Sequence, residues 1–152
     1  MKQRLFVLAL VLPLIGAEPA GYKYWSAADL KAKGAALGPK MNAQKVATDR
    51  LADFGNHYVL LAHREGPGEA EYHETEADVF VVQSGTATLV VGGTMANGKT
   101  TAPGEIRAPS IQGGSNQKLS AGDVVHIPSK TPHQLLIDGG KKFDYFVVKV
   151  KD

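Results

Sequence analysis

The chain has 152 residues, 43% of them hydrophobic and 21% charged, which is enough for one domain with a real core and too little for two. This composition argues against a disordered chain, and the 17 glycines and 8 prolines favour many turns and short strands. Because there is no cysteine, disulfides, thiolate metal ligands and a cysteine nucleophile are excluded.

Residues 1–20 have the pattern of a signal peptide. A short basic region is followed by an unbroken apolar run at 5–12 and by the small residues Ala17 and Ala20. The run is much shorter than the roughly 20 residues that cross a bilayer. We therefore expect cleavage near Ala17 or Ala20 and an exported, periplasmic or extracellular protein with no stable membrane insertion; an uncleaved membrane tether is the alternative.

Such processing changes the charge of the mature protein. Removing Lys2 and Arg4 from the 17 basic residues leaves 15, against 15 acidic residues after cleavage near Ala17, or 14 after cleavage near Ala20, which also removes Glu18. A nearly neutral protein lacks the basic surface of nucleic-acid binders, so no nucleic-acid partner is expected.

Residues 21–45 are expected to form a short helix and a linker. Ser26 is a suitable N-cap, and Asp29 three residues later completes a loose capping box. Helix formers dominate 27–36, and a Gly-Pro pair at 38–39 ends the helix.

From residue 46 the pattern changes to strands, and residues 46–152 are expected to form one all-β domain. Many short strands at close spacing, with no helix between them, indicate an antiparallel sandwich or barrel. The predicted strands are 47–54, 58–64, 70–73, 79–83, 86–91, 118–119, 124–127, 134–137 and 143–150. A turn at Ser84-Gly85 is expected between the fourth and the fifth.

Residues 92–116 show little periodicity and are rich in Gly, Pro, Thr, Ala and Ser. A loop of this length is uncommon in a compact domain and often serves a function, for example as a lid. An irregular hairpin that extends the edge of the barrel is the alternative.

Two segments carry the residues with metal-binding chemistry. Strand alternation places Glu71 and His73 on one face, and the chain returns at Asp78 after a short excursion. His133 opens a strand after a turn bounded by prolines, which suits a side chain whose position must be fixed.

The first of these segments resembles the first motif of the cupin superfamily. That motif reads Gly, five spacers, His, one spacer, His, three or four spacers, Glu, six spacers, Gly. His73 falls on the second histidine, Asp78 on the glutamate and Gly85 on the closing glycine, while Glu71 replaces the first histidine. The opening glycine, Gly66, lies one residue nearer than the pattern expects.

The second segment resembles the second cupin motif, which reads Gly, five spacers, Pro, one spacer, Gly, two spacers, His, three spacers, Asn. Gly122, Pro128 and His133 match it, whereas Lys130 replaces the second glycine and Ile137 the asparagine. The two motifs span residues 66–137, about half of the chain.

The resemblance implies a small jelly-roll barrel with a metal ion in its mouth. Cupins hold the metal on three histidines and one glutamate, and the matching positions here are Glu71, His73, Asp78 and His133. Two of the four differ from the pattern. Two imidazoles with two carboxylates would neutralise a divalent ion and suit Fe(II), Mn(II) or Zn(II). A barrel that has lost its metal and keeps these residues as a hydrogen-bonded cluster is the alternative.

The other three histidines are weaker candidates. His63, at a strand end near the expected barrel mouth, could support the metal ligands, while His57 is expected in solvent. His126 is expected in the core or on the surface.

Two classes of function fit these residues. The resemblance allows a metal-dependent enzyme of the dioxygenase, isomerase or lyase type that acts on a small polar molecule, and the fold alone does not choose among them. A binding module without turnover is the alternative. Cupins commonly dimerise through sheet edges, so a homodimer is compatible with either.

Overall fold

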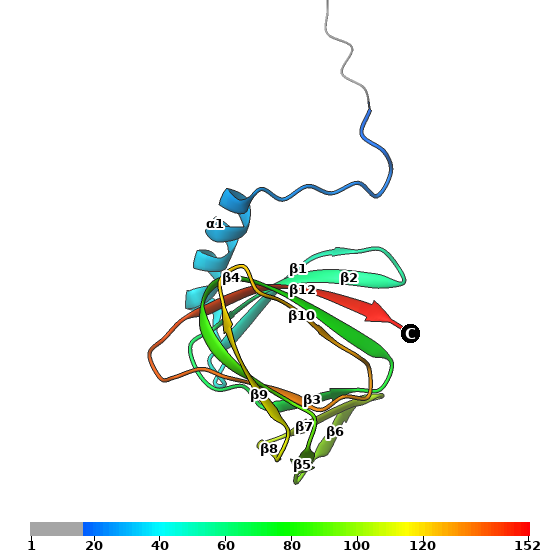
Figure 1. Cartoon of the computed structure of the whole chain (residues 1–152). Helices are drawn as coiled ribbons and strands as arrows, with labels where there is room; N and C mark the ends of the chain where they lie inside the picture. The colour runs from blue at the N-terminus through cyan, green and yellow to red at the C-terminus, as the bar shows by residue number, and fades with distance from the viewer. Residues whose placement is uncertain (1–16) are drawn as a thin grey trace, which may run out of the picture.

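Antiparallel strands dominate residues 17–152, the part of the chain that the computed structural model describes. They curl into an open barrel with one helix on its outside (Figure 1). The predicted signal peptide falls mostly on residues 1–16, outside the described residues. Within residues 17–152, no helix has the length and apolar character that a membrane crossing requires.

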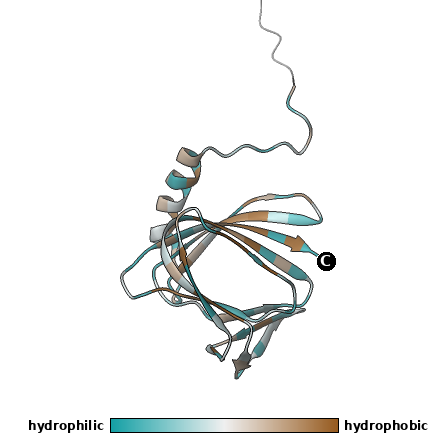
Figure 2. Cartoon of the chain, viewed as in Figure 1, coloured by the Kyte–Doolittle hydropathy of each residue, from teal (hydrophilic) through white to brown (hydrophobic). Residues whose placement is uncertain are grey.

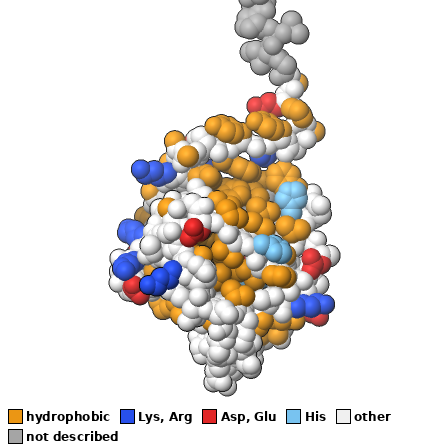
Figure 3. Space-filling view, in the orientation of Figure 1, with side chains coloured by type: hydrophobic (Ala, Val, Ile, Leu, Met, Phe, Trp, Pro, Cys, Tyr) orange, Lys and Arg blue, Asp and Glu red, His pale blue; other side chains and the backbone are white. Residues whose placement is uncertain are grey.

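Helix α1, Ala27–Leu37, confirms the predicted helix and its cap. The Ser26 hydroxyl accepts a hydrogen bond from the Asp29 amide at 3.1 Å, and the Asp29 carboxylate accepts one from the Ser26 amide at 3.1 Å. Leu37 packs with Ala47 and Leu61 in a small apolar cluster, so the helix covers the outer face of the neighbouring strands (Figures 1 and 3).

A short 3₁₀ turn, Gly38–Lys40, follows the helix. The strands are β1 Val46–Asp53, β2 His57–Arg64, β3 Ala70–His73, β4 Glu76–Val91, β5 Thr94–Ala96, β6 Lys99–Ala102, β7 Glu105–Ala108, β8 Ser110–Gln112, β9 Ser115–Ser120, β10 Val124–Ile127, β11 His133–Leu136 and β12 Phe143–Lys151.

The main sheet runs in the order β1-β2-β12-β4-β11-β3-β7-β6, with β9 and β10 also paired to β4. All pairings are antiparallel. The first half of β4 pairs with β10 and β12, and its second half with β9 and β11. One strand therefore belongs to both walls of the barrel, and hydrophobic segments lie on the strands that enclose it (Figure 2). This all-β architecture is that of the predicted jelly-roll barrel.

The predicted turn at Ser84-Gly85 is wrong, because β4 runs through it without reversing. Opposite β12, the register passes from Ser84 directly to Val82, which leaves one extra residue on β4. Gly85 has φ +79°, a value that glycine adopts without strain. The glycine thus bends a strand from one wall of the barrel into the other.

Residues 92–116 form strands rather than a structureless loop. β5 pairs with β8, and β6 pairs with β7. β7 then pairs with β3, so the segment extends the sheet edge as the hairpin interpretation predicts. The register sets Glu105 opposite His73 and Arg107 opposite Glu71.

Candidate metal centre

The two motif segments meet at one wall of the barrel. His133 on β11 is the register partner of Glu71 on β3, and the rings of His73 and His133 lie 5.2 Å apart, centre to centre. One ligand atom from each of Glu71, His73 and His133 lies within 4.8 Å of the other two. Pairing of strands distant in sequence therefore produces a cluster that is suitable for a metal ion.

Both imidazoles present the same nitrogen to the cavity. His73 Nδ1 donates to the Glu105 carboxylate at 2.6 Å, and His133 Nδ1 donates to the backbone carbonyl of Thr131 at 3.0 Å. These acceptors fix the orientation of each ring and leave Nε2 for a ligand, as is usual for metal-binding histidines. His133 Nε2 is buried and has no hydrogen-bond partner among the described residues.

Asp78, at the start of β4, lies beside both imidazoles. Its Oδ2 is 3.3 Å from His133 Nε2 and 3.5 Å from His73 Nε2. Its Oδ1 is 2.6 Å from Lys149 Nζ, an ion pair without hydrogen-bond alignment. Burial raises the pKa of Asp78, but the two imidazoles beside it and the Lys149 charge outweigh burial and lower the pKa below its usual range, so the carboxylate is ionised.

Glu71 is held by two arginines. Arg64 donates to one carboxylate oxygen at 2.9 Å, and Arg107 lies 2.6 Å from the other. Burial raises the pKa of Glu71, yet the nearby His73 and the two guanidinium charges bring it well below its usual range. The second oxygen is also 3.6 Å from His73 Nε2, so Glu71 is ionised at the edge of the site.

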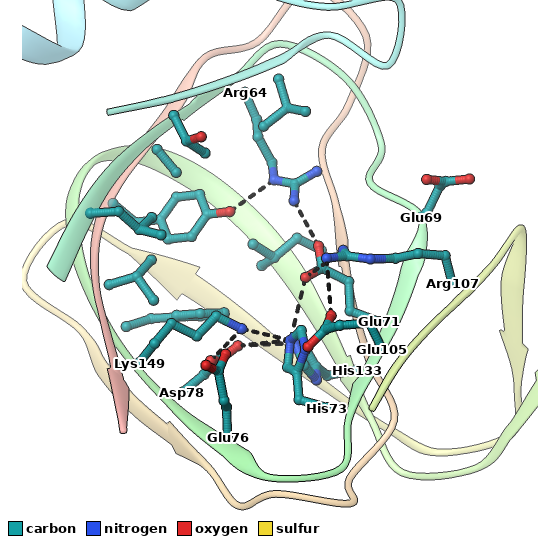
Figure 4. A pocket seen from close by; sticks show the side chains of 18 of the residues that line it. Arg64, Glu69, Glu71, His73, Glu76, Asp78, Glu105, Arg107, His133 and Lys149 are labelled. Atoms are coloured by element: carbon teal, nitrogen blue, oxygen red, sulfur yellow. Dashed lines mark hydrogen bonds and ion pairs between the residues drawn. The ribbon is translucent and has the colours of Figure 1, made fainter. Parts of the chain in front are cut away.

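Lys149 on β12 brings a third cation into the site. Its Nζ is 2.6 Å from His73 Nε2 as well as from Asp78, as Figure 4 shows. At that separation a single hydrogen atom fits between the two nitrogens. Burial and the Lys149 charge lower the pKa of His73, but the Asp78 and Glu71 carboxylates outweigh them and raise it to about 9. Nε2 can therefore carry a proton itself or accept one from Lys149, but not both. The negative charge at this point therefore attracts a cation to Nε2.

These residues line a cavity of about 480 Å³, a size suited to a small molecule. Five carboxylates and three cationic side chains line it, which gives a net charge of −2 with neutral imidazoles. The charged residues are Glu69, Glu71, Glu76, Asp78, Glu105, Arg64, Arg107 and Lys149.

The donor set fits a divalent metal ion. Imidazole nitrogens and carboxylate oxygens are ligands of Fe(II), Mn(II) and Zn(II). The partnerless Nε2 of His133 is an atom that a metal would satisfy, and a +2 charge would neutralise the lining.

The weaker histidine candidates lie elsewhere. His63 is buried, but its Nδ1 bonds Asp144 at 2.6 Å rather than any residue of the cluster. His57 stacks on Phe54 at a turn, and His126 is exposed on β10.

Sequence reasoning missed the four charged residues that contact the predicted ligands: Arg64, Glu105, Arg107 and Lys149. Glu105 and Arg107 lie in the segment expected to be irregular, so the strand pairing that places them beside His73 and Glu71 could not be predicted. Arg64 and Lys149 lie on predicted strands. Strand alternation puts Lys149 on the same face of β12 as Phe143, Tyr145 and Val147, but both faces of this strand are apolar, so alternation does not say which face points inward.

No protein-family model matches the chain, and a comparison with curated protein sequences finds no match. Solved structures do resemble it. TT1209 from Thermus thermophilus aligns with TM-score 0.53 and 16% identity, over 72% of this chain and 87% of that one. The polyketide cyclase RemF from Streptomyces resistomycificus gives 0.51 and 16%, over 74% and 69%.

The DMSP lyase DddQ from Ruegeria pomeroyi gives TM-score 0.51 and 16% identity, over 71% of this chain and 48% of that one. The chain thus spans about half the length of the lyase. At these identities the likeness concerns the fold alone. Taken with the barrel topology and the meeting of the two motif segments, it shows that the chain has the fold of the cupin superfamily.

Proposed function

We propose that the protein binds one divalent metal ion in the barrel through Nε2 of His73, Nε2 of His133 and the carboxylate of Glu71, with Asp78 beside both imidazoles. The observation that carries this proposal is the orientation of the two rings. Each Nδ1 is engaged by an acceptor, and each Nε2 is turned toward the same point.

We further propose that the bound metal acts on a small polar molecule in the cavity. A metal ion would supply Lewis-acid chemistry there. The protein would orient the ligand between the charged groups of the lining and the apolar side chains of Leu60, Phe80 and Val147. Asp78, if it is not a ligand, is placed to accept a proton from a group near the imidazoles.

A metal-free binding module is the second candidate, and one observation favours it. The carboxylates of Glu71 and Asp78 already face cations, namely Arg64 and Arg107 for the first and Lys149 for the second. Such a cluster could bind a small polar ligand through its own charges.

Metal analysis of the purified protein separates the two candidates. We expect about one divalent ion per chain in the wild type and less than about one tenth of that in His73→Ala and His133→Ala. His126→Ala is the matched control, because it removes an exposed imidazole outside the site. Full metal content in either cavity variant would remove that histidine from the site, and a metal-free wild type that cannot be loaded would favour the second candidate.

Enzyme and binding module differ in whether the metal has an open coordination position. The visible spectrum of the Co(II)-loaded protein should change when small carboxylates, phenols or enediols are added, if such a position exists. A spectrum that none of them changes would indicate a closed coordination shell and no turnover at the metal.

We also propose, on the sequence pattern of residues 1–20, that the protein is exported and cleaved near Ala17 or Ala20. The intact mass of the protein recovered from its native compartment tests this, because cleavage removes the basic and apolar segments together. A full-length mass would contradict cleavage.

A further inference from the structure

Lys149 is a buried lysine that lies between two of the predicted metal ligands, Asp78 and His73. It lies on β12, on the same face as Tyr145 and Val147, and only 8% of the residue is exposed. Its ammonium contacts Asp78 Oδ1 and His73 Nε2, each at 2.6 Å, as the dashed lines in Figure 4 show. A lysine serving only as an ion-pair partner of Asp78 would not need the contact with the imidazole.

The atom that Lys149 faces is the metal-binding atom of His73. Because Nδ1 is engaged by Glu105, Nε2 is the only nitrogen of this ring that can bind a metal. One lone pair cannot serve an ammonium hydrogen and a metal ion together. In addition, an ammonium and a divalent ion a few ångströms apart repel each other strongly inside a protein.

The position of Asp78 follows from the same contact. Asp78 matches a ligand position of the motif and lies 3.3–3.5 Å from both Nε2 atoms, yet the tight cluster consists of Glu71, His73 and His133. Its Oδ1 faces the Lys149 ammonium instead. The lysine therefore neutralises the carboxylate that would otherwise complete a four-ligand set.

We infer that Lys149 is a resident cation that competes with the metal ion and keeps Asp78 from binding it. This inference rests on the proposed metal function. In the metal-free protein the ammonium bridges Asp78 and His73. Metal binding displaces it from His73 Nε2 but leaves it with Asp78, so the metal is held by Glu71, His73 and His133. The lysine thereby weakens metal binding and sets the number of protein ligands at three.

The test is Zn(II) titration of chelator-treated full-length protein against a chromophoric chelator, for the wild type and Lys149→Met. Methionine keeps an unbranched stem but has no charge. We expect Lys149→Met to bind Zn(II) about tenfold tighter or more, because it removes a competing charge and frees a carboxylate. Lys142→Met is the control, since that lysine is exposed and pairs with Glu65 outside the cavity.

A further variant tests the part played by Asp78. In Asp78→Asn/Lys149→Met most of the gain in Zn(II) affinity over the wild type should disappear, and a gain that persists there would overturn the assignment of Asp78.

Thermal unfolding provides a second measurement. Metal-free Lys149→Met should unfold at a lower temperature than the wild type, because Asp78 loses its partner. Zn(II) should raise the Tm of this variant by more than it raises that of the wild type. If Lys149→Met does not fold, Lys149→Gln takes its place.

The outcomes separate this inference from the proposed function. Equal affinity of the wild type and Lys149→Met for Zn(II) would overturn the role of Lys149 while the metal function stands. The same holds if Lys142→Met tightens binding as much as Lys149→Met does. Absence of Zn(II) binding in all of these proteins would overturn both.

Discussion

Lys130 has a backbone conformation that suits glycine, and it lies in the turn that carries His133. Its φ is +60°, in the left-handed region that most side chains avoid. The Lys130 amide donates to the carbonyl of His73 at 2.7 Å, so the turn is tied directly to the strand that bears the other histidine. The cupin motif has glycine at this position, and the backbone angle explains that preference physically.

Replacing Lys130 with glycine should therefore stabilise the protein. Relief of left-handed strain exceeds the entropy that glycine adds to the unfolded chain, for a net gain of about 0.5–1 kcal/mol. Urea unfolding measures it. Lys141→Gly is the control, because Lys141 is exposed and has no positive φ; it should lose stability. A loss in Lys130→Gly as large as in Lys141→Gly would show that the turn carries no strain.

Glu105 fixes the ring of His73 without being a ligand itself. We expect Glu105→Ala to weaken metal affinity about 10- to 100-fold, as loss of such supporting acceptors usually does. Metal competition titrations measure the effect. Glu74→Ala, which removes an exposed carboxylate next to His73, is the control and should change affinity little. An unchanged affinity in Glu105→Ala would mean that the barrel wall alone orients the imidazole.

At the scale of elements, the bend of β4 depends on Gly85. A side chain there would combine a left-handed backbone with a clash against the backbone of Lys142. Gly85→Ala should cost about 3 kcal/mol or more, the sum of strain and overpacking. Gly122→Ala is the matched control, since Gly122 also has a positive φ but open space around it. If both variants lose the same free energy of unfolding in urea, the clash at Gly85 adds nothing to the cost of the left-handed backbone.

The strands show where sequence reasoning succeeds and where it stops. The helix cap at Ser26 and most strands follow from local patterns, because hydrogen-bonding side chains and alternation act over a few residues. The continuity of β4 does not, since it depends on β12, whose Phe143 pairs with Gly85. A Ser-Gly pair favours a turn locally, and pairing with a distant strand decides otherwise.

The site shows the same division between local and distant information. The motif spacing predicted Glu71, His73, Asp78 and His133 as one cluster, and their side chains do lie near one another inside the barrel. It did not predict the cations that surround them. On β12 both faces are apolar, because Phe146 packs against Trp25 on the outside while Tyr145 faces the barrel. Alternation alone therefore could not tell which face carries Lys149 inward.

For the whole molecule, metal binding should raise stability. A ligand that binds only the folded state stabilises it by about 4 kcal/mol at a free concentration near 1,000 Kd. For a domain of this size each kcal/mol shifts Tm by about 2–4 °C, so calorimetry should show an increase of roughly 8–16 °C. His133→Ala should show almost none. A wild-type Tm that does not change when metal is added would contradict a specific metal site.

Association of two chains stays a prediction. β1, β6, β9 and β10 each pair with only one other strand in the main described sheet, and unpaired edges are where further strands can add. Light scattering of the purified protein gives the mass in solution. A mass of one chain at micromolar concentration would contradict the homodimer.

The placement of β12 governs when the barrel can close. This strand occurs last in the chain, yet it lies between β2 and β4 and pairs with both along its length. Until it arrives, the two earlier strands have no common neighbour and the wall that carries Lys149 does not exist. A chain emerging from a ribosome can therefore complete the barrel only once β12 has emerged, which makes the addition of this strand a late step of assembly.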